Sequence, residues 1–92
     1  MILKIKAKRK VHEISIDDED FLKVSKHTWY VNFSSKRIYV YSYMNGDRVL
    51  MHRFILGITD SEVRIKHIDM NGLNNQRSNI AYQNKEYEFQ IR

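Results

Sequence analysis

Polar residues that can do chemistry are concentrated around one turn between residues 66 and 80. His67 ends an apolar and basic segment, the turn Met70-Asn71-Gly72 follows it, and Asn79 lies twelve positions after the histidine. A hydrolytic nuclease needs a base that activates water and a cation that stabilises charge on phosphorus. A histidine from a strand and an asparagine from the following helix can present a base and a metal ligand together. Histidine and asparagine side chains near a turn often satisfy only local hydrogen bonds, and the spacing alone favours that interpretation.

The elements that must position these residues are short. Alternation of apolar and polar residues predicts strands over 2–8, 11–16, 28–33, 37–43 and 47–50. Capping signals predict short helices over 17–26, 51–57 and about 74–83, the last beginning at Asn74 or Asn75. Residues 61–68 are expected to be extended, with turns at 34–36 and at Asn45-Gly46. The pattern predicts an α+β fold: a small antiparallel sheet with short helices.

Two local patterns have both a structural and a functional interpretation. The acidic residues from Asp17 to Asp20 are better explained by helix capping than by a metal site. The tyrosines at 39, 41 and 43 share one strand face, where they either pair across the sheet or stack on bases. The tail from 84 to 92 also alternates, which indicates an added strand or a segment that binds a partner.

Composition limits the classes of protein that the chain can belong to. Its 92 residues predict a single domain, with a formal net charge of +5 that suits a polyanion such as nucleic acid. A positive surface with no such role is equally compatible with this charge. There is no cysteine, no apolar run long enough to span a membrane and no apolar signal segment. We therefore expect a cytoplasmic protein that is neither secreted nor bound to a membrane.

Several segments, in order along the chain, resemble phage and intron-encoded HNH homing endonucleases. They are Ile16-Asp17-Asp18-Glu19-Asp20, Trp29, Tyr39-Val40, Met51-His52-Arg53 and the stretch from Lys66 to Ile80. The resemblance covers about residues 14–80 and implies a ββα-metal core, in which two antiparallel strands flank Met70-Asn71-Gly72 and a helix bears Asn79. It divides the single HNH-like domain, 1–92, into N-terminal strands with a short helix (about 1–50), the ββα motif (about 51–83) and a tail (84–92). The host cell would be bacterial.

The same resemblance implies roles for individual residues. His67 would be the general base, and Asn79 would bind a metal or orient the site. His52 and Arg53 would contact phosphate or hold the loop, whereas Asn71, Gly72 and Asn75 are expected to serve as turn and cap residues. The DNA contacts expected from charge and position are His52, Arg53, Arg77, Lys66, Arg37, Lys4, Lys6 and Lys8.

Three departures from the family pattern surround the expected metal site. Lys66 replaces the metal-binding acid, Met70 replaces the turn glycine, and Ala81 replaces an arginine. An ammonium group offers no lone pair to Mg²⁺ or Mn²⁺, and Asp69 is the nearest substitute carboxylate. The family's C-terminal DNA-recognition domain is also expected to be absent, because the chain ends at Arg92.

These features leave three hypotheses about function. The leading one is a DNA-interacting HNH homologue of phage or mobile-element type whose phosphodiester cleavage is weak or lost, with no cofactor. The second is an active nicking or cleaving endonuclease that uses Mg²⁺ or Mn²⁺ held by Asn79 and Asp69. The third is an HNH scaffold that now binds a protein, for example as a phage inhibitor of a host defence enzyme. A homodimer is compatible with all three.

Overall fold

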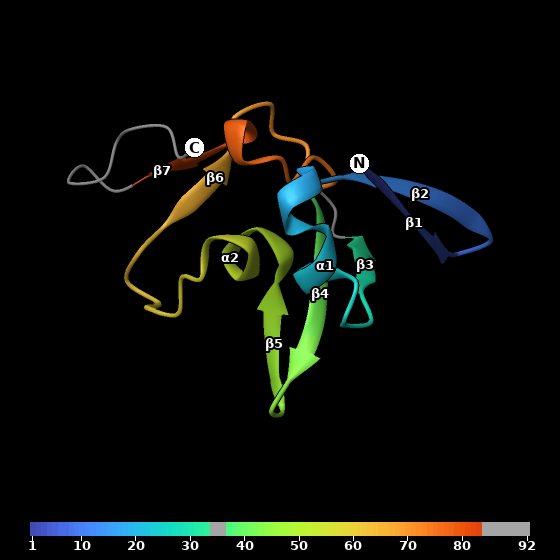
Figure 1. The fold of residues 1–92 in the computed structure, drawn as a ribbon, viewed down its shortest axis with the longest axis horizontal. Coiled ribbons are helices and arrows are strands. Elements are labelled where there is room, and N and C mark those ends of the chain that lie inside the picture. Colours follow the sequence, from blue (N-terminus) through green and yellow to red (C-terminus); the bar gives the residue numbers. More distant parts are fainter. Residues whose placement is uncertain (34–36, 84–92) are drawn as a thin grey trace.

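The computed structural model describes residues 1–33 and 37–83, which form a small α+β fold of antiparallel sheets and short helices (Figure 1). Three sheets are formed by β1 (Ile2–Ala7) with β2 (Lys10–Ser15), by β3 (Tyr30–Phe33), β4 (Ile38–Met44) and β5 (Asp47–Leu50), and by β6 (Ile65–His67) with β7 (Ile80–Tyr82). The helical segments are η1 (Asp18–Asp20), α1 (Phe21–Val24), α2 (Met51–Leu56) and η2 (Arg77–Asn79). The α+β class predicted from the sequence is confirmed.

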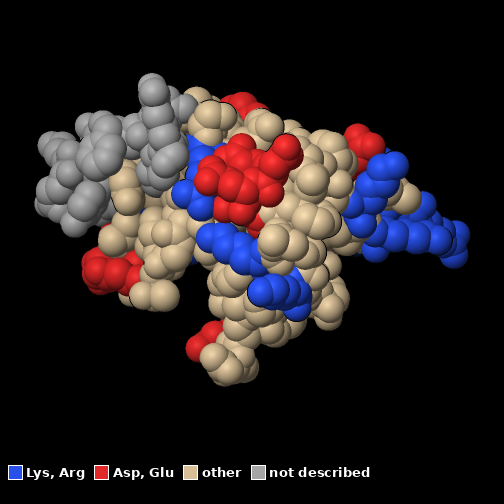
Figure 2. Space-filling model, viewed as in Figure 1, with Lys and Arg blue, Asp and Glu red and all other residues tan. Residues whose placement is uncertain are grey.

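The β1–β2 hairpin projects from one side of the molecule, and its basic residues are seen together in Figure 2. The predicted alternation is confirmed, because the even-numbered residues of β1 are exposed and the odd-numbered ones are partly buried. The turn is made by Lys8 and Arg9, whose φ angles are 51° and 64°. Residues other than glycine, asparagine and aspartate rarely adopt this left-handed conformation. The two basic residues at the tip of the hairpin therefore have an unfavourable backbone conformation.

The central sheet and α2 also follow the sequence signals closely. Asn45 and Gly46 turn the chain between β4 and β5 with φ angles of 52° and 84°, as an Asn-Gly hairpin requires. Gly57 ends α2 with φ at 68°, and its N–H contacts the carbonyls of Arg53 and Phe54. Both predictions, the hairpin turn and the short helix ended by glycine, are confirmed.

The hydrophobic core lies between the helices and the first two sheets. Its buried members are Ile14, Ile16, Val24, Trp29, Val40, Met51 and Ile55. The indole Nε1 of Trp29 donates a hydrogen bond of 2.7 Å to the carbonyl of Val24, which fixes α1 against the start of β3. The predicted helix over 17–26 occurs in shorter form as η1 and α1. Within α1, Val24 is buried in the core whereas Leu22 is 74% exposed.

The segment after the turn differs most from expectation, because no helix spans 74–83. Arg77–Asn79 makes a single 3-10 turn, and Ile80–Tyr82 is the strand β7, which pairs antiparallel with β6. Asn74 and Asn75 do not begin a helix. Instead the backbone N–H of Asn75 donates to the carbonyl of Ser15 at 2.7 Å, which attaches the loop to the end of β2. This long-range pairing replaces the local hydrogen bonds of a helix.

Gly72 lies where the loop passes directly over β4. A Cβ atom at this position would lie 1.7 Å from the carbonyl oxygen of Ile38, so no larger residue fits without movement of the backbone. The glycine therefore sets the distance between the turn and the central sheet.

Two predictions, the turn at Ser34-Ser35-Lys36 and the alternating tail over 84–92, lie outside the described residues. In the part of the chain that the structure describes, no helix is long and apolar enough to cross a membrane.

Candidate functional site

A cleft of about 620 Å³ lies between the start of β4, the beginning of α2 and the chain around β6. His52 and His67 both line it. Among the residues that the structure describes, the charged ones that line the cleft are the cations Arg37, Arg53, Arg64 and Lys66. Among the described lining residues there is no aspartate or glutamate. This electrostatic character favours an anionic ligand.

His67 stands at the end of β6 and is held by a buried amide. Its Nε2 lies 2.6 Å from Oδ1 of Asn75, a side chain that is only 1% exposed. The Asn75 amide nitrogen donates to the carbonyl of Gly72 at 3.2 Å and contacts the sulfur of Met51 at 3.4 Å, which turns its oxygen toward His67. Because that oxygen only accepts, Nε2 carries the proton in the neutral imidazole, and Nδ1 carries the lone pair.

His52 forms the second imidazole of the site. It is the second residue of α2, it is 7% exposed, and its ring centroid lies 4.5 Å from that of His67. Burial, together with electrostatic interactions with His67 and Arg53, lowers the pKa of His52 to about 3. His52 is therefore neutral at pH 7 and supports the ring of His67. The predicted phosphate contact by His52 would therefore be made by a neutral imidazole.

Asn79 and Asp69, the two predicted metal ligands, bind each other. Oδ1 of Asn79 accepts the backbone N–H of Asp69 at 3.0 Å, and its amide nitrogen donates to Asp69 Oδ1 at 2.8 Å and to the carbonyl of Asn74 at 2.9 Å. The second Asp69 oxygen accepts from the Asn74 amide at 3.0 Å. Asn79 thus orients the loop, which was one of the two roles expected of it.

The ionisation of Asp69 reflects the same contacts. Desolvation alone would raise its pKa, but hydrogen bonds from Asn71, Asn74 and Asn79 and the nearby charge of His67 lower the pKa overall. The carboxylate is exposed and serves as an acceptor within the loop. It is not among the residues that line the cleft.

The side chains that line the cleft, among the residues that the structure describes, do not suit binding of Mg²⁺ or Mn²⁺. These hard cations prefer carboxylate oxygens, whereas the described lining offers two imidazoles among four cationic side chains. Lys66, at the position where a carboxylate was expected, is exposed and lines the cleft. Its ammonium repels a metal ion and attracts a phosphate.

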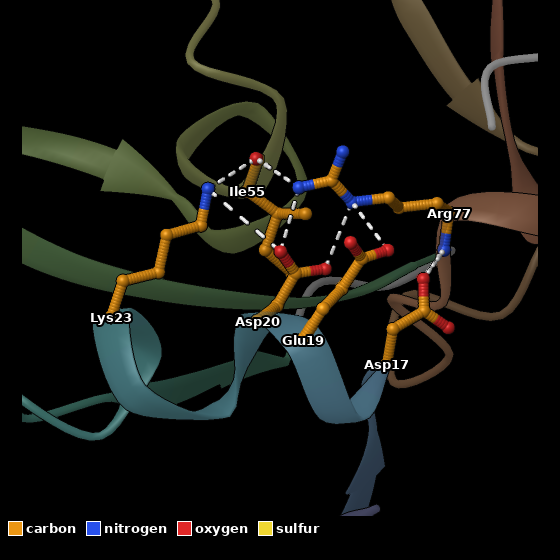
Figure 3. Close-up of polar contacts among 6 residues, drawn as sticks. All are labelled: Asp17, Glu19, Asp20, Lys23, Ile55 and Arg77. Atoms are coloured by element: carbon orange, nitrogen blue, oxygen red, sulfur yellow. Dashed lines mark hydrogen bonds and ion pairs between the residues drawn. The ribbon is translucent and has the colours of Figure 1, made fainter.

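Arg77 lies away from the cleft, in a polar cluster with the acidic residues of η1 (Figure 3). Its guanidinium donates to both carboxylate oxygens of Asp20, at 2.7 and 3.0 Å, and its backbone N–H donates to Asp17 at 3.1 Å. The hydrogen bond with Asp20, opposed by desolvation, raises the pKa of Arg77. The predicted DNA contact by Arg77 is not supported by this geometry, because its charge is already paired with a carboxylate that is 1% exposed.

The acidic residues of η1 fit their predicted role only in part. No side-chain capping hydrogen bond occurs at the start of η1 or of α1. Carboxylate oxygens of Asp17, Glu19 and Asp20 do lie within 4.8 Å of one another, a spacing that a metal ion can bridge. Arg77 instead joins this group, which connects the loop of the site to the N-terminal half of the chain. Asp18, Glu19 and Asp20 do lie in the first turn of η1, as the helix dipole favours, but no side-chain capping hydrogen bond accompanies them.

The other predicted DNA contacts fall into two groups. Arg37, Lys66 and Arg53 line the cleft, and the first two are exposed. The Arg53 guanidinium donates hydrogen bonds to the carbonyls of Val63 and Asp60, at 2.8 and 2.6 Å. Arg53 thus holds the loop before β6, as one of its two expected roles required. The hairpin lysines, Lys4, Lys6 and Lys8, are exposed but do not line the cleft.

Two features of the site are absent from the sequence-based prediction. Arg64 lines the cleft, and its position two residues before Lys66 in the extended segment is a signal that points to it. Asn75 was assigned to turn or cap chemistry, yet its side chain holds the catalytic candidate His67. Searches of protein-family models, curated proteins and solved structures find no significant match to this chain.

Proposed function

We propose that the cleft binds the sugar–phosphate backbone of DNA, and that the chain is an HNH endonuclease homologue of phage or mobile-element type whose metal-dependent cleavage is weak or lost. One observation carries this proposal: an oriented histidine, His67, stands in a cleft whose charged lining residues, among those that the structure describes, are four cations. Phosphate oxygens are the ligands that arginine and lysine bind most readily on nucleic acids.

The strand arrangement around His67 supports the HNH relationship. β6 ends in His67 and pairs antiparallel with β7, and the intervening loop is held by Asn79 through Asp69 and Asn74. Two antiparallel strands that flank a loop are what the first part of a ββα-metal core requires. The helix of such a core is not formed by residues 74–83, because Asn79 lies in the 3-10 turn η2 directly before β7.

Each residue of the cleft has a distinct role in this proposal. Oδ1 of Asn75 accepts the hydrogen bond from the Nε2–H of His67. The Nδ1 atom of His67 therefore carries the lone pair that accepts a proton from water or from a ligand hydroxyl. Neutral His52 packs against the ring and adds no charge. Lys66 binds a phosphate oxygen where the family would hold a divalent cation. Binding is therefore retained while the metal-assisted step is lost.

Incubation with supercoiled plasmid and Mg²⁺ or Mn²⁺ tests the catalytic half of the proposal. We expect no metal-dependent nicking above background by the native chain. The variant Lys66→Asp supplies a carboxylate next to His67, and the double variant Lys66→Asp/His67→Ala is its matched control. Nicking by the native chain that disappears in His67→Ala would show an active metal-dependent endonuclease and would contradict the proposal.

A DNA-binding assay tests the other half. Fluorescence anisotropy with a labelled duplex at low salt should show binding that Lys66→Gln weakens. Absence of any binding at about 20 mM salt would exclude DNA as the ligand and would favour the hypothesis of an HNH scaffold that binds a protein.

A further inference from the structure

Tyrosine rings form a continuous cluster on one face of the central sheet, which we call the tyrosine face and define as Tyr30, Tyr41 and Tyr43. Tyr30 lies directly opposite Tyr41 in the β3–β4 register, with ring centroids 5.6 Å apart. Tyr43 lies 5.6 Å from Tyr41 and 6.2 Å from Tyr30. The three rings thus lie next to one another, with interplanar angles between 34° and 90°.

Two of the three tyrosines are exposed, whereas Tyr41 between them is partly buried. Tyr43 is 60% exposed, and Tyr30 is among the exposed large side chains as well. The opposite face of β4, with Val40 and Ser42, is buried against the core. An exposed aromatic cluster of this kind is unusual unless it binds something, because it leaves a large apolar surface in water.

The tyrosine face continues into the cleft of the candidate site. Tyr39 precedes Tyr41 by two positions on β4 and therefore shares its face, and Leu50 is the β5 partner of Tyr41. Both Tyr39 and Leu50 line the cleft beside His67 and Lys66. A ligand whose anionic part occupies the cleft can therefore extend along β4 over the rings.

The charge on this face also favours an anionic ligand. The Arg48 guanidinium lies 5.2 Å from the centroid of Tyr41, and among the described residues no salt bridge includes Arg48. At the other end, Arg37 and Lys66 line the cleft. Cations at both ends of an aromatic row match a polymer that alternates flat rings with negative charges, which is the chemistry of a nucleic acid strand.

We propose that unpaired bases of a single-stranded nucleic acid stack on the tyrosine face while the adjoining backbone passes through the cleft. Base pairs in a duplex already stack on each other and do not expose their faces, so only unpaired bases can use the rings. The inference rests on the proposed function and narrows it: the preferred ligand is a single strand, or a duplex with an unpaired end, rather than a continuous duplex.

The test compares a fluorescein-labelled 12-nucleotide oligothymidine with a 12-base-pair duplex in anisotropy titrations at one salt concentration. We expect the native chain to bind the single strand more tightly. Tyr43→Leu, which removes the ring and keeps a large apolar side chain, should weaken binding of the single strand roughly tenfold. Tyr43→Phe should stay within about twofold of the native chain. Leu22→Ala, at an exposed site on α1, should have no effect.

The outcomes separate this inference from the proposed function. If Lys66→Gln weakens binding of both DNA forms while Tyr43→Leu changes neither, the base-stacking inference is wrong and the cleft proposal stands. If neither DNA form binds, both are wrong. If Tyr43→Leu abolishes only a concentration-dependent self-association in sedimentation velocity, the tyrosine face is an interface between copies and the inference is again wrong.

Discussion

Replacing Arg77 with methionine tests whether this residue holds the fold together or contacts DNA. Its guanidinium makes two hydrogen bonds to Asp20, whose carboxylate is 1% exposed. Removing one partner of a buried ion pair costs about 3–5 kcal/mol, because the other charge stays buried. Lys23 remains 3.9 Å from Asp20, so the lower end of that range applies. We expect Arg77→Met to reduce the free energy of unfolding by about 3 kcal/mol.

This loss is large for a chain of 92 residues, whose total stability should be roughly 5–14 kcal/mol. A loss of about 3 kcal/mol corresponds to a fall of about 12–24 °C in the melting temperature. Urea denaturation followed by circular dichroism measures the change without adding salt that screens the pair. The double variant Arg77→Met/Asp20→Leu should recover most of the lost stability, because it no longer buries an unpaired carboxylate.

Lys26→Met is the matched control, since it removes the same charge from an exposed position and should change stability by less than about 0.5 kcal/mol. The structural role of Arg77 would be refuted by a variant that unfolds like the native chain yet binds DNA more weakly and with a smaller salt dependence. That result would restore the role predicted from charge alone.

Three further changes test other parts of the structure. Lowering the pH from 7 to 5 should reduce the free energy of unfolding by about 2 kcal/mol through His52. The pKa of about 3 keeps this histidine neutral in the folded protein, while it gains a proton in the unfolded chain. In urea titrations, His52→Gln should lack this pH-dependent loss of stability. Gly72→Ala should destabilise by about 3 kcal/mol, against about 1 kcal/mol for the strained but open turn change Gly46→Ala, as measured by urea denaturation. Replacing Lys8 and Arg9 with Asn-Gly should raise the melting temperature by several degrees, because it relieves two left-handed residues.

The sequence predicts well those elements whose signals are local. The Asn45-Gly46 turn requires left-handed angles that these two residue types supply, and Gly57 ends α2 for the same reason. The alternation of β1 follows from the period of a strand. Each of these signals lies within a few residues of the feature that it determines.

The features that the sequence does not predict depend on contacts between distant segments. Arg77 and Asp20 lie 57 positions apart, and nothing local to either residue indicates that they pair. The helix expected over 74–83 is replaced because Asn75 is attached to Ser15 and residues 80–82 pair with β6. His67 was identified from its residue type and spacing, but the amide that orients it became evident only when Asn75 was seen to be buried.

The central claim, that the cations of the cleft bind the DNA backbone, is tested most directly by the salt dependence of binding. The measurement is the slope of log K against log [NaCl] for a labelled oligonucleotide with the native chain and with Lys66→Gln. Each phosphate contact adds about 0.9 to the magnitude of this slope for a duplex and about 0.7 for a single strand, so removing one cation should lower the magnitude by about 0.7 to 0.9. An unchanged slope in Lys66→Gln would place the DNA elsewhere on the molecule and would contradict the account.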